Sequence, residues 1–283
     1  MTDDENQAGN PSCKTSSNPL ALHGRHFDFG QTVFALCNYP ALLTAGLTDG
    51  DEEDIIHVGE LVRKGASGAR GDDTKTLKSA VLKWLVPRGQ PLIPPLSQNM
   101  KLDREFNHEV TSRLLCPAGL DWSNAETKQS LKSGEIAVCG DQWLIFLYSG
   151  YNYDPDDPWK GLLKSEILIF GFKHVFTSPS SVDREPKATH SSNAYLHGMK
   201  SMTKGSLAYI ATQIQFSLSS SSVFSCTDTV TDSENFYHSI LDLLEDPDEI
   251  EEVTDLMTWW TSHMFPNSSS QRTISKNSAL FKI

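Results

Sequence analysis

The stretch "TKGSLAYIATQIQFSLSSSS", residues 203–222, decides whether the C-terminal half of the chain forms one body or two. Apolar residues recur through it at helical spacing, at Leu207, Ile210, Ala211, Ile214 and Leu218. This period continues without interruption into the four serines, and serine is a mediocre helix former rather than a helix breaker. A flexible linker would carry Gly or Pro, whereas Val223 and Phe224 follow the serines at once. The pattern therefore predicts a helix end that turns a corner, with the C-terminal half as one body.

The two helices that follow have clear boundaries in the sequence. The first begins with a capping box formed by Thr231 and Glu234. Asp246 is a typical N-cap residue and Pro247 suits the first turn of the second helix, which Pro266 ends. Apolar residues form one stripe along the second helix, at Ile250, Val253, Met257, Trp260 and Met264. We expect this stripe to face the core.

Helical periodicity also appears in the N-terminal half. The strongest example covers residues 72–86 and ends at Pro87. Its apolar face consists of Leu77, Ala80, Val81, Trp84 and Leu85. Weaker patterns predict further helices, over 31–47, 49–65, 103–115, 123–134 and 158–176. A capping box of Ser123 and Glu126 opens one of them, and Pro158 opens the last, which is apolar on most sides.

These patterns predict a mainly α fold with a single helical domain. Residues 1–30 lack periodicity and are rich in Asn, Ser and Asp, so we expect a disordered N-terminal arm. The helical domain is predicted over 31–265, with its most clearly helical core over 140–265. Residues 266–283 are expected to form a short, loose C-terminal tail.

The composition restricts the compartment and the classes of partner. A formal net charge of −12 disfavours wholesale binding to nucleic acid or to anionic membranes, although a local basic patch can override it. No stretch approaches the roughly 20 apolar residues that span a bilayer, and the acidic N-terminus is unlike a signal peptide. The five cysteines are odd in number and widely spaced. We therefore expect reduced thiols and an intracellular protein, cytoplasmic or nuclear.

Three stretches contain groups typical of metal sites, and each has a simpler interpretation. The acids in 243–255 crowd a helix N-terminus, where the helix dipole favours negative charge. The Asp-rich stretch 151–161 lacks the glycine and glutamate positions of a calcium loop. His23, His26 and Asp28 resemble part of an iron-binding triad, but they lie in the predicted arm. The sequence thus predicts no catalytic, cofactor-binding or metal-binding residue.

The charges are distributed unevenly along the chain. Residues 228–260 contain eleven acids and no Lys or Arg, whereas 61–104 contain nine Lys or Arg against three Asp. Lys75, Lys78 and Lys83 lie opposite the apolar face of their predicted helix, and Arg88 follows it. These four residues are the candidate partner-binding residues. The alternative is that the basic segment is a solvated face that balances the acidic lobe of the same molecule.

Several long motifs resemble a known domain family. They include "DDTKTLKSAVLKWL", "CPAGLDW", "GDQWLIFLY" and "YDPDDPWKGLLKSEIL", and the resemblance covers roughly residues 50–265. The family is an uncharacterised domain of unknown function that is expanded in basidiomycete fungi. The resemblance implies a fungal source, and it implies no activity, catalytic residue or cofactor.

Three functions remain open at this point. The first is a non-enzymatic interaction module inside the cell, with a protein as its partner. The second is a nucleic-acid-associated or mobile-element-linked protein that uses the basic segment 61–104. The third is an enzyme of unknown class. An exposed apolar patch would favour a protein partner, a continuous basic surface would favour nucleic acid, and a pocket with convergent polar groups would favour an enzyme.

Overall fold

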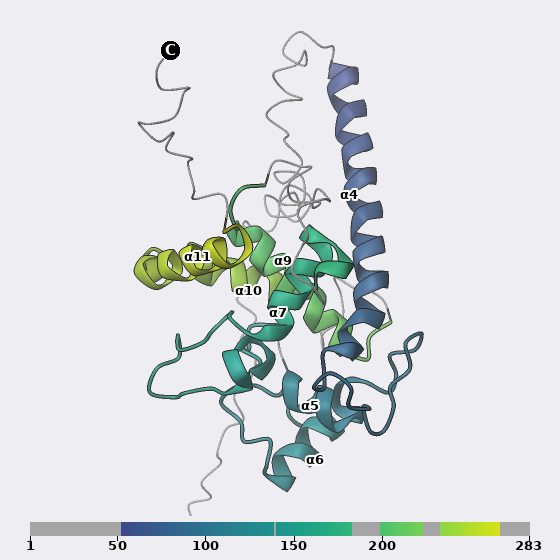
Figure 1. The fold of residues 1–283 in the computed structure, drawn as a ribbon, viewed down its shortest axis with the longest axis vertical. Helices are drawn as coiled ribbons and strands as arrows, with labels where there is room; N and C mark the ends of the chain where they lie inside the picture. Colours follow the sequence, from purple (N-terminus) through teal and green to yellow (C-terminus); the bar gives the residue numbers. More distant parts are fainter. Residues whose placement is uncertain (1–51, 139, 183–198, 223–232, 267–283) are drawn as a thin grey trace, which may run out of the picture.

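The computed structural model describes residues 52–138, 140–182, 199–222 and 233–266 and shows a single, mainly helical domain (Figure 1). The predicted fold class is thereby confirmed. Within these ranges the backbone forms isolated bridges but no strand. The α-helices are α4 (Glu52–Ala80), α5 (Glu109–Leu115), α6 (Ala125–Ser133), α7 (Glu166–Phe172), α9 (Lys204–Leu218), α10 (Ser233–Glu245) and α11 (Ile250–Met264). The predicted arm 1–30, the predicted helix over 31–47 and nearly all of the predicted tail lie outside the described residues.

Helix α9 is the centre of the domain. Every residue from Gly205 to Leu218 is buried, because α4, α5, α7 and α10 all pack against this helix. A capping box of Thr203 and Ser206 opens it, and Ser219 leaves it in an extended conformation. The central helix therefore ends at Leu218 and the chain turns at the serines, as the sequence predicted, and the small buried Ser217 and Ser219 allow close neighbours.

The contact between α7 and α9 depends on one glycine. A Cβ atom built on Gly171 would lie 3.0 Å from Cδ1 of Ile214 and 3.1 Å from Cγ2 of Ile210. These distances are tighter than ordinary van der Waals contact, so a larger residue at this position would push against the side chains of Ile210 and Ile214. The apolar run before it, with Ile167 and Leu168 fully buried, seals the same interface.

The helices predicted over 49–65 and 72–86 are one helix. Helix α4 runs without a break from Glu52 to Ala80, and a 3-10 turn, Val81–Lys83, follows it. The intervening sequence "GASGARG" contains glycine but no proline, and glycine weakens a helix without removing a hydrogen bond. Its C-terminal half packs on α9 through the fully buried Leu77, while its N-terminal half extends beyond the other helices (Figure 1).

Two other helix boundaries differ from the prediction. The helix expected from Pro158 begins only at Glu166. The preceding residues form turns instead, because the backbone N–H of Ser149 donates to the carbonyl of Gly161 at 2.8 Å. In α6 the N-cap is Asn124 rather than Ser123, and its side chain accepts from the backbone N–H of Glu126 at 2.8 Å.

The stripe predicted for the last helix is correct in its centre and wrong at its start. Val253 and Trp260 are buried, whereas Ile250 is 67% exposed. The buried face of α11 is centred on Val253, Leu256 and Trp260, and at about 100° per residue Ile250 lies about 90° from this centre, at the edge of the face. Asp246 caps the 3-10 turn that precedes α11, Pro247–Glu249, as predicted, since its side chain accepts from the backbone N–H of Asp248 at 2.9 Å.

Polar side chains connect α4 to α9 beside the buried Leu77. The Tyr209 hydroxyl donates to Oδ2 of Asp73 at 2.8 Å, and the Thr74 hydroxyl donates to Oε1 of Gln213 at 3.0 Å. Burial raises the pKa of Asp73 to about 6, although the hydrogen bond from Tyr209 opposes the rise and the charge of Asp72 adds to it. The folded protein therefore binds this proton more tightly than the unfolded chain does.

This raised pKa predicts a pH-dependent contribution to stability. The stabilisation from protonated Asp73 is fully present below pH 3.8 and is lost as the pH rises through about 6. Asp73→Asn should remove this loss, so its stability relative to wild type should increase by about 1–2 kcal/mol between those pH values. Urea unfolding at pH 4 and pH 7 measures the change, with the exposed Asp156→Asn as control. Equal pH dependence of Asp73→Asn and wild type would show that Asp73 titrates normally.

Candidate functional site

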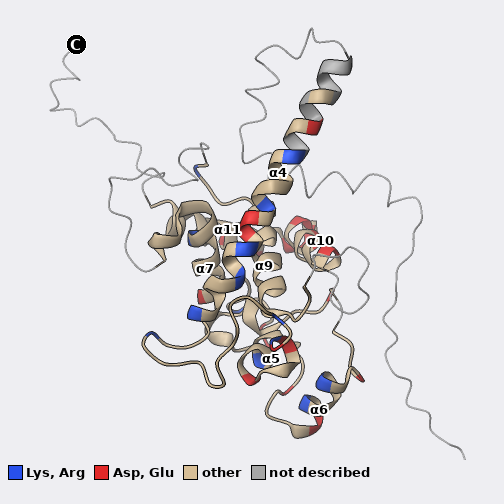
Figure 2. Ribbon diagram, turned by 90° about the vertical axis from the view of Figure 1, so that its right-hand side faces the viewer, with Lys and Arg blue, Asp and Glu red and all other residues tan. Residues whose placement is uncertain are grey.

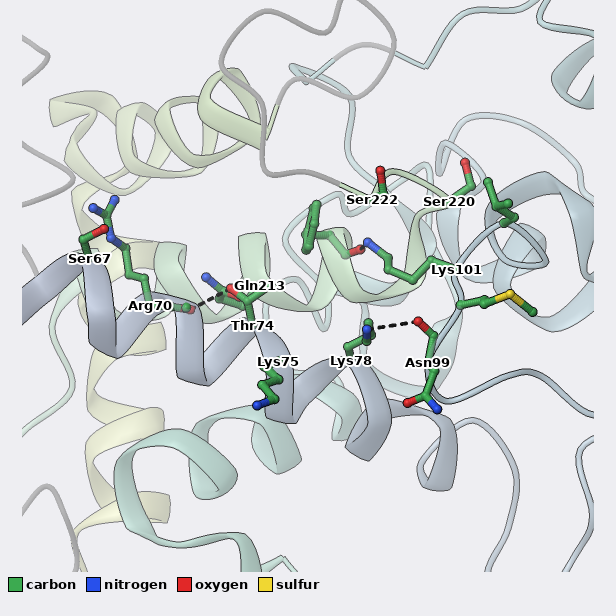
Figure 3. Close-up of a pocket in the computed structure, with 14 residues that line it drawn as sticks. Ser67, Arg70, Thr74, Lys75, Lys78, Asn99, Lys101, Gln213, Ser220 and Ser222 are labelled. Carbon is green, nitrogen blue, oxygen red and sulfur yellow. Dashed lines mark hydrogen bonds between the residues drawn. The ribbon is translucent and has the colours of Figure 1, made fainter.

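A groove runs along α4 where this helix faces the loop 97–102 and the end of α9 (Figure 3). Its volume is about 740 Å³. The cationic side chains that line it are Arg70, Lys75, Lys78 and Lys101. The remaining lining is neutral, with the small residues Ser67 and Gly71 on α4 and the exposed Met100 and Leu102 on the loop. A shallower hollow continues along α4 to Lys64 and Glu60.

The α4 wall presents its cations at helical spacing. Lys75 and Lys78 are three residues apart, which places them as neighbours on one face of the helix. Lys78 is half-buried and its Nζ donates to the carbonyl of Asn99 at 3.1 Å, which links α4 to the loop. Lys75 is exposed, and no hydrogen bond or ion pair holds its ammonium group among the residues described. This wall thus offers a free charge beside an anchored one.

The opposite wall contains a buried lysine at the end of α9. Nζ of Lys101 donates to the carbonyl oxygens of Phe216 and Ser221, the latter at 2.6 Å, and lies 3.3 Å from the centroid of the Phe216 ring. The last carbonyls of a helix carry partial negative charge, so a cation stabilises this end. Burial lowers the pKa of Lys101 to about 7, with a smaller effect from Arg104, while Glu105 opposes the shift.

A buried arginine anchors the same loop one turn further along. Nη1 of Arg104 donates to the carbonyl of Ser217 at 2.5 Å, and Nη2 donates to the carbonyl of Ser97 at 3.0 Å. The side chain is fully buried, and burial lowers its pKa. Glu105 completes the attachment by accepting hydrogen bonds from the backbone N–H and the hydroxyl of Ser220. In the sequence, Lys101 and Arg104 count among the basic residues of 61–104. In the structure both side chains instead cap the C-terminal end of α9.

The structure brings together two of the four candidate partner-binding residues. Lys75 and Lys78 line the groove, whereas Lys83 and Arg88 do not. Lys83 is exposed in the 3-10 turn beside His174, whose pKa falls chiefly through burial and further through the charge of Lys83. Nη2 of Arg88 donates to the carbonyl of Val182 at 3.3 Å, away from the groove.

Sequence reasoning missed two of the cations that line the groove. Arg70 lies two turns before Lys78 on α4, and its place was hidden because 49–65 and 72–86 were expected to be separate helices. Lys101 follows a proline-rich loop, and no periodicity marks its burial. A continuous helix over 52–80 would have been the one signal that groups Arg70 with Lys75 and Lys78.

The charges that line the groove suit an anionic group. The groove concentrates positive charge in a chain of net charge −12, while α10 carries acids without any Lys or Arg (Figure 2), and so does α11. No cluster of His, Cys, Asp or Glu within the described ranges has the geometry to hold a metal ion. Cys116 is buried, and burial raises the pKa of its thiol to about 11. Its thiolate, the reactive form, is therefore disfavoured.

The described helices include none with the combination of length and apolar character that a membrane crossing requires. Neither curated proteins nor solved structures show a match to the chain. Residues 64–265 match a family of unknown function (DUF6698), and this region contains both walls of the groove. Because the match covers well over half of the sequence, the chain belongs to that family.

Proposed function

We propose that the protein is a non-enzymatic interaction module inside the cell and that its groove binds an acidic segment of a protein partner. One observation carries this proposal: Arg70, Lys75 and Lys78 line one wall of a groove whose lining contains no acid, while Lys101 on the other wall is bonded to the carbonyls that end α9. Such a charge pattern attracts carboxylates at long range and selects against cationic partners. The buried thiol of Cys116 suits a reducing compartment, cytoplasm or nucleus.

The groove fits a peptide better than it fits nucleic acid. Its rim contains Met100 and Leu102, which are 63% and 76% exposed, so apolar side chains of a bound peptide have a place to pack. A single strand of nucleic acid usually stacks its bases on exposed aromatic rings. Phe216 is the aromatic residue of the lining, and it is buried with the ammonium group of Lys101 over its ring. Nucleic acid association through the wider segment 61–104 is the second candidate, favoured by the charge of that segment alone.

The resemblance to a family expanded in basidiomycete fungi adds an expectation about origin. We propose a fungal source, and many related copies would suit a set of modules that recognise different partners. In that case the helices would stay similar while the groove lining varied. The origin thus concerns only how many different partners are bound, and the proposal itself rests on the charge of the groove.

Neutralising the α4 wall should weaken binding of an acidic peptide. Each exposed ion pair contributes about 0.5–1 kcal/mol, so Lys75→Gln with Lys78→Gln should weaken binding of a fluorescently labelled Glu-rich peptide by roughly 5- to 30-fold. Fluorescence anisotropy on the full chain measures the affinity. Lys132→Gln with Lys200→Gln is the matched control, because it changes the net charge equally at exposed positions outside the groove.

Three outcomes of this titration would separate the candidates. A loss of peptide affinity in the groove variant alone supports the proposal. Equal losses in the groove and control variants would reduce the effect to net charge and would overturn it. Tighter binding of a labelled DNA or RNA oligonucleotide than of the peptide, with a salt slope that falls in the groove variant, would favour the nucleic-acid alternative instead.

A further inference from the structure

The outward face of α11 is negatively charged, whereas the groove is lined by positive charges. Glu251 and Asp255 are one turn apart and point away from the buried side of the helix, which carries Val253, Leu256 and Trp260. Asp248 and Glu252 flank them, and all four acids are exposed. Neither α10 nor α11 contains a Lys or Arg, and these four carboxylates have no ion pair within the described ranges.

The groove and this face of α11 match in a second property. Ile250 directly precedes Glu251 and is 67% exposed, so a large aliphatic side chain lies on the surface beside these acids. The groove combines its cations with the exposed Met100 and Leu102. Both surfaces therefore combine charged groups with exposed apolar side chains, and the two surfaces carry opposite charges. Along both helices the charged residues are spaced by one turn, about 5 Å.

We propose that the groove of one copy binds the acidic face of α11 of a second copy. This inference rests on the proposed function, because it names the occupant of the same groove. The small residues Ser67 and Gly71 on the α4 wall leave room for a helix to approach, since no Cβ or longer chain fills the space at Gly71. The ammonium groups of Lys75 and Lys78 would then meet the carboxylates of Glu251 and Asp255.

The placement of the two surfaces determines the kind of assembly. Helices α4 and α11 lie on opposite sides of the bundle (Figure 1), so the groove and the acidic face of one copy are used by different neighbours. Such a head-to-tail contact is heterologous and builds chains or rings rather than a two-fold dimer. The surfaces are small and charged, so the contact should be weak and sensitive to salt.

Neutralising variants of each surface test the contact by sedimentation equilibrium of the full chain. The groove variant is Lys75→Gln with Lys78→Gln, and the helix variant is Glu251→Gln with Asp255→Asn. We expect the average mass of wild type to rise with concentration beyond that of a dimer at about 0.1 M salt and to return to monomer at about 1 M, where the Debye length is about 3 Å. Each variant alone should remain monomeric, with its association weakened at least roughly tenfold.

A mixture of the two variants gives the sharpest result. The intact groove of the helix variant can bind the intact α11 of the groove variant. The two surfaces left free in this dimer are both mutated, so the mixture should form a dimer and nothing larger. Ile250→Ser, which leaves the charges unchanged, should weaken this dimer if the apolar match is real. A monomeric mixture, or a wild type that stays monomeric at every concentration, would overturn the inference.

Peptide binding distinguishes failure of this inference from failure of the proposed function. The helix variant has an intact groove and should bind the Glu-rich peptide as wild type does. If it binds the peptide while wild type never self-associates, the groove recognises acidic segments of other proteins and the second copy is not its occupant. If neither the peptide nor a second copy binds, the groove has no such role and both proposals fall.

Discussion

We expect Trp260→Ala to lower the free energy of unfolding by about 3–5 kcal/mol, the range for a large buried aromatic residue. Trp260 is fully buried and packs beside Phe172, with ring centroids 6.0 Å apart. Its Nε1 also donates to the carbonyl of Leu163 at 2.9 Å, so the substitution leaves a cavity and an unpaired buried carbonyl. Urea unfolding followed by circular dichroism measures the loss.

Two further substitutions act as controls for Trp260→Ala. Trp260→Phe keeps most of the packing and should lose mainly the hydrogen bond, at about 1 kcal/mol. Asp246→Ala removes the cap that accepts from the backbone N–H of Asp248 and should also cost about 1 kcal/mol. Equal losses for Trp260→Ala and Asp246→Ala would show that Trp260 is not part of the core.

Arg104→Ala is expected to have a similarly large effect through a different mechanism. Removing this fully buried side chain leaves the carbonyls of Ser217 and Ser97 without their donor and opens a cavity at the end of α9. Each buried carbonyl left without its donor costs about 1–3 kcal/mol, so the two together should cost about 2–6 kcal/mol. Because Arg104 holds the loop that forms one wall of the groove, the variant should also bind the Glu-rich peptide less tightly, although Arg104 does not line the groove.

Arg104→Lys and Arg113→Ala are the controls for this prediction. The lysine keeps one positive charge but cannot reach both carbonyls, so we expect an intermediate loss of stability. Arg113 is exposed on α5, and its removal should change stability by no more than about 0.5 kcal/mol. If Arg104→Ala proved as stable as wild type, the attachment of the loop to α9 would not depend on this arginine.

Short-range patterns were sufficient to predict much of the fold. The helical class, the central helix that ends at the serines, and the Asp246 cap all follow from residues within a few turns of each other. Boundaries failed where distant residues decide them. The turns before α7, for example, depend on the hydrogen bond that joins Ser149 to Gly161.

Helical periodicity could predict only those residues of the candidate site that lie on one helix. Lys75 is exposed on the side of the helix opposite Leu77, as the helical wheel predicted, whereas Lys78 is half-buried and Lys83 falls in the 3-10 turn. Lys101 bonds to the carbonyl of Phe216, which is 115 residues away in sequence, and no local pattern contains that contact. The sequence therefore indicated one wall of the groove and left the other wall hidden.

Hydrogen exchange with and without the Glu-rich peptide tests most directly whether the groove binds acidic segments. The full chain would be labelled in deuterated buffer at low salt, and exchange would be measured by mass spectrometry. We expect slower exchange in the groove segments, residues 67–78 and 97–102, with no change in α6, which lies outside the groove. Protection confined to α6, or no protection at a peptide concentration that saturates binding, would show that the groove does not bind the peptide.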